Sequence, residues 1–188
     1  AIPNNTAASI AEKEKAKATI EKQKESISPD LRQKMSETRH LYSKDDSMDR
    51  YIGETKKAWE NFDSETKYAL FSYTKITYDE INTALRTGKG LDDDNKGRID
   101  KITSAIDKVE LKSDSWLVRG TSTNSLNKMF GTKEIITEKS VSSLIGQTGQ
   151  DKGFVSCGSS EGTGFTESQV QLSIFAPAGT KAIYAEPF

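Results

Sequence analysis

The chain has 188 residues, with 27 Lys and Arg against 28 Asp and Glu, a formal charge of −1 and a pI near 6.0. This length predicts one domain, or one domain with an arm, and the balanced charge argues against a nucleic-acid-binding protein. One cysteine, Cys157, excludes an intrachain disulfide framework and a Cys-based zinc site, and one histidine, His40, excludes most familiar triads and metal sites. No stretch has the roughly 18 apolar residues of a membrane span, and the N-terminus lacks the basic start and apolar core of a signal peptide.

Residues 1–45 are predicted to form a charged helical arm. Within it, residues 11–25 carry nine charged side chains of alternating sign, which is typical of an exposed helix with i,i+4 ion pairs. The alternative is that this run docks or tethers the chain to another polypeptide. A second helix is expected from Asp30 to Leu41, and the SKDDS run at 43–47 is expected to be a turn.

The central part of the chain is predicted to be helical. Residues 54–86 have the pattern of two helices, and residues 92–109 that of a further amphipathic helix. Tyr68, Phe71 and Ser72 fall on one face of the segment that follows the acidic helix start at 63–65.

The last quarter of the chain has a different composition. Residues 140–188 hold only six charged side chains but seven of the thirteen glycines, which indicates strands and turns. Short strands are expected at 116–118 and 154–155, and residues 170–174 alternate between apolar and polar side chains, as in a half-buried strand. A further strand is expected to begin at 182–185. The chain is therefore predicted to belong to the α+β class.

Five sequence motifs follow one another between residues 73 and 184. They are YTKITYDEINTALRTG at 73–88, WLVRGTS at 116–122, GFVSCGSS at 153–160, the pattern F-x-x-x-x-V-x-L-x-I-x-x-P at 165–177, and GTKAIY at 179–184. In order and spacing they resemble the ADP-ribosyltransferase exoenzyme family, the C3-type exoenzymes and the enzymatic components of clostridial binary toxins. The resemblance runs from Trp59 to Tyr184. It implies one domain over residues 46–188, with helices packed on a mixed β-sandwich of the ADP-ribosyltransferase type, and NAD as a substrate without a metal.

The resemblance assigns most of the NAD-binding residues. Arg119 matches the strand arginine that contacts the NAD diphosphate and the adjoining ribose, a role that suits a planar, permanently charged fork. Gly120 beside it would let a ligand approach the backbone. Tyr73, Tyr78 and Asn82 match residues that line the NAD pocket from the helical side. The alternatives are a surface ion pair for the arginine, core packing for the tyrosines and helix capping for the asparagine.

Three further positions match the family with differences. Arg86 matches an arginine that can reach the phosphates, and Phe165 an aromatic residue that stacks near the nicotinamide. Ser156 matches the first serine of a Ser-Thr-Ser motif, which positions the catalytic glutamate through a hydrogen bond. Cys157 and Gly158 replace the other two members of that motif, and Cys157 is expected to be a buried apolar residue.

The catalytic glutamate of the family is expected to lie outside this chain; the alternatives are that another segment supplies it or that this copy is inactive. In the family it belongs to a Glu-x-Glu or Gln-x-Glu pair after the strand that GTKAIY begins, where it stabilises the cationic ribosyl transition state. Glu186 comes too early to match it. Ser168 also replaces an arginine found in the toxin branch.

Two functions are compatible with this pattern. One is an NAD-dependent mono-ADP-ribosyltransferase that acts on a host protein acceptor, as a bacterial or phage-encoded toxin or effector that is secreted or delivered into a target cell. The other is a catalytically degenerate transferase domain that serves as a docking module. With either, residues 1–45 would connect to a translocation component or to a larger parent polypeptide.

Overall fold

The computed structural model describes residues 27–38, 40–160 and 162–185. The chain divides into two compact units, one of Ala1–Glu37 and Thr123–Gln150 and the other of Thr38–Ser122 and Asp151–Phe188. No helix in the described ranges is long and apolar enough to cross a membrane. The charged run at 11–25 lies outside these ranges, so the arm stays a prediction.

Among its described residues, the first unit contains three short helices, α2 (Pro29–Glu37), α7 (Thr123–Phe130) and the 3-10 helix η2 (Val141–Leu144). After α7, the Asn127 side-chain oxygen accepts a hydrogen bond from the Ile136 N–H at 3.0 Å. The predicted extension of the 30–41 helix to Leu41 is wrong. Because α2 has no buried residue, it lacks the tertiary packing that would extend so short a helix.

The helices of the second unit are α3 (Lys44–Glu60), α4 (Ser64–Ser72), the π-helix η1 (Tyr73–Thr77), α5 (Tyr78–Thr87) and α6 (Asp93–Ile106). Side chains cap the starts of α3, α4 and α6; at α4 the Asp63 carboxylate accepts from the Thr66 N–H at 2.7 Å. The predicted turn at 43–47 is wrong, because Ser43 caps α3 by accepting from the Asp46 N–H at 3.2 Å. Serine followed by aspartates occurs both in turns and at helix starts, and here it begins a helix.

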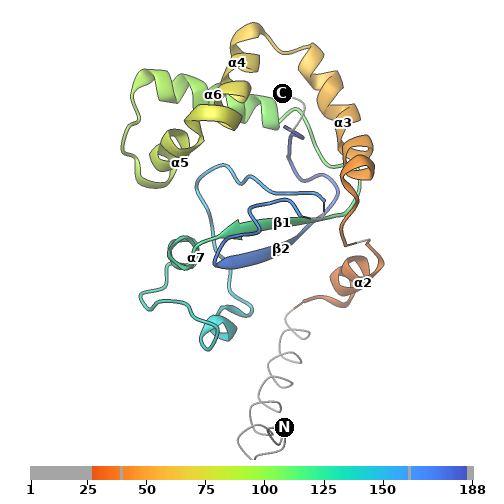
Figure 1. Cartoon of the computed structure of the whole chain (residues 1–188), viewed down its shortest axis with the longest axis vertical. Coiled ribbons are helices and arrows are strands. Elements are labelled where there is room, and N and C mark those ends of the chain that lie inside the picture. Colours follow the sequence, from red (N-terminus) through yellow and green to blue (C-terminus); the bar gives the residue numbers. More distant parts are fainter. Residues whose placement is uncertain (1–26, 39, 161, 186–188) are drawn as a thin grey trace, which may run out of the picture. The chain divides into compact units, whose positions relative to one another are not determined.

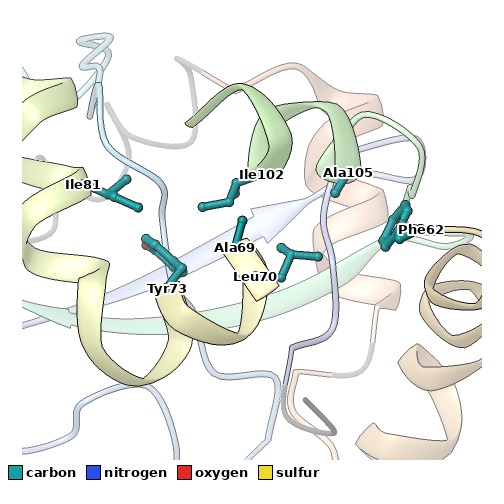
Figure 2. Close-up of a cluster of buried hydrophobic side chains, with 7 residues drawn as sticks. All are labelled: Phe62, Ala69, Leu70, Tyr73, Ile81, Ile102 and Ala105. Atoms are coloured by element: carbon teal, nitrogen blue, oxygen red, sulfur yellow. The ribbon is translucent and has the colours of Figure 1, made fainter. Parts of the chain in front are cut away.

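The core of this unit lies between α4, η1, α5 and α6 (Figure 2). Its buried members are Phe62, Ala69, Leu70, Tyr73, Ile81, Ile102 and Ala105. On α4 the face that carries Tyr68 and Phe71 is not the core face, because these rings are 66% and 46% exposed. The π-helix that follows widens the turn by one residue and thereby changes the register between α4 and α5. Tyr73, at its start, is buried.

Two antiparallel strands complete the unit, β1 (Ser115–Thr121) and β2 (Val170–Ala176) (Figure 1). In the register, Arg119 pairs with Leu172 and Gly120 with Gln171. Gly158 lies on the other edge of β1 and exchanges two backbone hydrogen bonds with Val118, of 2.7 and 2.9 Å. Helices on a small antiparallel sheet confirm the α+β class.

Two predicted strands are not formed within the described residues. At 154–155 the Phe154 N–H donates to the side chain of Asn82 instead of to a neighbouring strand. At 182–185 the Tyr184 N–H donates to the Thr55 hydroxyl at 3.0 Å. A backbone donor used in this way cannot continue a ladder, and the nearby isolated bridges, at Gly158, Ser160 and Lys181, lie outside both segments.

Candidate functional site

A buried polar centre joins the helices to the segment that precedes Gly158. Asn82 on α5 is 7% exposed. Its amide donates to the Tyr73 hydroxyl at 3.0 Å, and its oxygen accepts from the Phe154 N–H at 2.8 Å. The Tyr73 hydroxyl also lies 3.4 Å from the Phe154 carbonyl oxygen and 3.5 Å from the Ser156 hydroxyl. The rings of Tyr73 and Phe154 meet edge to face at 5.6 Å. The structure therefore brings three of the predicted site residues together.

Arg119 reaches the same segment from the sheet. Its Nη1 donates to the Ser156 carbonyl oxygen at 2.6 Å, although the two residues are 37 apart in the chain. No other hydrogen bond of this guanidinium is present among the described residues. Ser156 is itself exposed. A cation with unused donors thus stands beside an accessible hydroxyl-bearing residue, an arrangement that can receive an anionic ligand.

Arg86 is engaged by the carboxylate of Asp151, which lies outside the five sequence motifs. Its Nε and Nη2 donate to the two oxygens of Asp151 at 2.7 and 2.8 Å. These hydrogen bonds raise the pKa of Arg86. Burial acts to raise the pKa of Asp151, but the hydrogen bonds from Arg86 and from the Gly153 N–H outweigh it, so the pKa lies below its ordinary value. Both groups are charged at neutral pH.

The close approach at Gly120 is made by the chain itself. The Gly120 N–H donates to the Gly164 carbonyl oxygen, and a Cβ at Gly120 would collide with the carbonyl oxygen of Phe165. Phe165 has a φ of 65°, which a bulky residue rarely adopts, and 63% of it is exposed. A strained backbone that displays an aromatic ring beside β1 is the kind of feature that clusters at binding sites.

One departure from the Ser-Thr-Ser motif, Gly158, has a local structural cause. A Cβ at Gly158 would collide with the Thr163 hydroxyl and lie 2.7 Å from the Gly164 nitrogen, so a serine does not fit without a shift of that turn. Burial raises the pKa of the Cys157 thiol, and Arg119 lowers it by less. The thiol is therefore protonated at neutral pH, as expected for a residue that is not a nucleophile.

One predicted site residue, Tyr78, stands apart from this centre, whereas Ser168 lies beside Gly120. Tyr78 begins α5 and is 55% exposed, and among the described residues no hydrogen bond or ring contact joins it to the other site residues. Ser168, where the toxin branch has an arginine, donates its N–H to the Phe165 carbonyl oxygen at 3.1 Å. It supports the turn that carries the exposed ring.

Comparison with known proteins identifies the family. The family model described as ADP-ribosyltransferase exoenzyme matches residues 48–188. The chain belongs to the ADP-ribosyltransferase exoenzyme family. No curated protein sequence matches this exoenzyme-family chain.

Solved structures share the fold of this exoenzyme-family chain. Plx2a, an ADP-ribosyltransferase toxin from Paenibacillus larvae, superposes with a TM-score of 0.66 at 24% identity, covering 79% of either chain. The Clostridium limosum C3 exoenzyme gives a TM-score of 0.60 at 19% identity, covering 81% of either chain. C3stau2 from S. aureus, solved with NAD, gives 0.60 at 19% identity, covering 79% of this chain and 78% of its own.

Asp151 and Phe154 were missed in the sequence because neither has a distinctive spacing to Arg86 or Asn82. One feature of the sequence does indicate Asp151. Asp151 and Lys152 are the only charged residues between positions 140 and 160, and an isolated charge in such a segment is often paired with an opposite charge.

Proposed function

We propose that the chain is a mono-ADP-ribosyltransferase that binds NAD beside Arg119 and Ser156 and modifies a protein acceptor. The observation that carries the proposal is the hydrogen bond between the Arg119 guanidinium and the Ser156 carbonyl oxygen. It joins two motif residues from different elements at an exposed position. Family membership and the NAD complex of C3stau2 support NAD as the substrate.

The chain's own residues fit such a ligand. The remaining donors of Arg119 suit phosphate oxygens, which accept bidentate hydrogen bonds from a guanidinium. The exposed ring of Phe165 provides an apolar surface on which a planar base can stack. Ser156 would position the catalytic glutamate, which the resemblance places after the last motif.

In the reaction, the bond between ribose C1′ and the nicotinamide nitrogen breaks, and nicotinamide leaves with the bonding electrons. A side chain of the acceptor forms the new bond to C1′ and releases its proton to solvent. The chain's task is to hold the diphosphate and the ribose so that this carbon is presented to the acceptor. Because the family is described as exoenzymes and Plx2a as a toxin, we propose that the acceptor belongs to a target cell.

Thermal unfolding with and without NAD tests the proposal. A ligand that binds only the folded state raises its stability by about 2.7 kcal/mol at a hundred times its Kd. We expect millimolar NAD to raise the melting temperature of the wild-type chain and Arg119→Ala to abolish the increase. Arg98→Ala on α6 is the matched control, because in the described part of the chain Arg98 donates only to Asn95, at 3.3 Å, and the substitution should leave the increase intact. An unchanged wild-type melting temperature would refute NAD binding.

The degenerate docking module is the second candidate, and Gly158 is the observation that favours it. The second serine of the family motif does not fit at this position, so the structural support that this serine provides in the family is lost at Gly158. Release of nicotinamide distinguishes the two functions when the protein assayed includes the glutamate that the resemblance places after the last motif. An enzyme releases nicotinamide from NAD in proportion to time and protein, whereas a module that only binds releases none.

A further inference from the structure

We propose that Asp151 is a positioning residue: its carboxylate clamps residues 151–156 onto α5 and thereby fixes where Ser156 meets Arg119. This inference rests on the proposed function for its consequence in NAD binding. Its structural part concerns the loop alone and is tested separately.

The carboxylate of Asp151 makes three hydrogen bonds at once. Two come from Arg86, at 2.7 and 2.8 Å, and the third from the Gly153 N–H, at 2.9 Å. The Asp151 side chain is 11% exposed, against 34% for Arg86. The carboxylate therefore closes its own loop and ties that loop to a helix 65 residues earlier in the chain. Charge-assisted bidentate pairs of this kind are the stronger class of hydrogen bond.

The segment behind Asp151 is seated closely on α5. A Cβ at Gly153 would lie 2.9 Å from the Asn82 side-chain oxygen and 3.0 Å from Cζ of Arg86, so glycine alone fits without a shift. One residue later, the Phe154 N–H donates to Asn82. Two residues after that, Ser156 accepts from Arg119. The position of Ser156 is thus set by a continuous series of contacts that begins at Asp151.

This clamp gives Arg86 a different task from the one that the resemblance implies. With Nε and Nη2 both on Asp151, Arg86 acts as the anchor of the loop and not as a phosphate ligand. The phosphate-binding cation is then Arg119. Asp151 also attracts Arg119 electrostatically, so the carboxylate faces two cations, Arg86 by direct contact and Arg119 through space.

The loop can be tested without NAD, because Cys157, the single cysteine, follows Ser156 directly. Its thiol is partly buried, and its rate of labelling by a disulfide reagent reports how often residues 151–157 lift away. Loss of a charge-assisted hydrogen bond corresponds to about a tenfold change in such an opening equilibrium. We expect Asp151→Asn and Arg86→Gln each to speed labelling about tenfold, and the double variant to speed it no further.

Glu65→Gln is the control for labelling, because it breaks the ion pair with Lys101 between α4 and α6 and should leave the rate unchanged. Circular dichroism verifies that each variant is folded. If Asp151→Asn does not fold, Gly153→Ala replaces it, since it displaces the same segment and keeps the charges. A labelling rate within twofold of wild type in folded Asp151→Asn, or in Gly153→Ala where that variant replaces it, would overturn the clamp.

NAD affinity, measured by calorimetry, tests the consequence. We expect Asp151→Asn and Arg86→Gln each to weaken NAD binding about tenfold, with the double variant equal to either one, because both remove the same contact. If Arg86→Gln weakens binding further in the Asp151→Asn background, then Arg86 binds the phosphates and the proposal is wrong. If the wild-type chain does not bind NAD while labelling changes as expected, the proposed function fails and the clamp stands.

Discussion

Asn82 joins the helices to the site segment, and Asn82→Ala tests how much that junction contributes to stability. The substitution removes the hydrogen bond to the Tyr73 hydroxyl and leaves the Phe154 N–H without its acceptor. A buried polar group left unpaired costs about 1–3 kcal/mol, and Asn82 is only 7% exposed. Tyr73 keeps the Phe154 carbonyl oxygen and Ser156 as neighbours, which reduces its share of the cost. We therefore expect the free energy of unfolding to fall by about 2–4 kcal/mol.

Urea denaturation measures this loss of stability. The same loss should lower the melting temperature by about 5–15 °C for a chain of this size. Asn61→Ala is the matched control. Asn61 is exposed, and its amide donates to the Lys57 carbonyl oxygen at 2.8 Å, so water can replace the lost bond. Tyr73→Phe keeps the ring on Phe154, and its effect should not add fully to that of Asn82→Ala. An Asn82→Ala loss no larger than that of Asn61→Ala would refute the assigned role of Asn82.

Three other outcomes are expected. Gly120→Ala should lower the free energy of unfolding, measured in urea, by about 1–3 kcal/mol, because the new Cβ collides with Phe165. Gly97→Ala on α6 is the control: its Cβ meets open space, so the free energy of unfolding should rise by about 0.5–1 kcal/mol. Phe165→Gly should not destabilise the chain, because it relieves a positive φ, but it should reduce the thermal protection by NAD. Burial acts to raise the pKa of Asp151, yet the hydrogen bonds from Arg86 and Gly153 hold that pKa below its ordinary value. The ion pair of Asp151 and Arg86 therefore stabilises the fold above about pH 4 and loses this effect as the pH falls further. The difference in urea stability between wild type and Asp151→Asn should accordingly shrink on acidification, and a constant difference from pH 7 to pH 2 would contradict it.

Periodicity and capping chemistry predicted most of the helices. Asp63 begins α4, and Gly88, at a φ of 73°, closes α5, both as their residue types suggest. The alternation over residues 170–174 is realised in β2, whose burial alternates in the same way. These features depend on neighbours within a few residues, which is why the sequence alone predicts them.

The features that the sequence did not predict depend on distant contacts. The π-helix from Tyr73 to Thr77 has no local signature, since its residues also suit an α-helix. Residues 154–155 do not form the predicted strand because the Asn82 side chain, 72 residues away, accepts a hydrogen bond from the Phe154 N–H, which a strand would need as a donor. The pair of Arg86 with Asp151 is likewise set by the tertiary fold. The order of the motifs indicated which residues come together, but not which hydrogen bonds position them.

Stability and ligand binding are coupled unequally among the site residues. Tyr73 is part of the hydrophobic core and Asn82 is buried beside it, so a substitution at either position changes the fold as well as the site. Arg119 is only partly buried, and among the described residues its guanidinium makes one hydrogen bond, to the backbone oxygen of the exposed Ser156. Loss of NAD binding in an Asn82 variant could therefore come from the altered fold or from the altered site. The same loss in Arg119→Ala, at unchanged stability without ligand, is attributable to the lost cation, so Arg119 is the residue at which binding can be separated from folding.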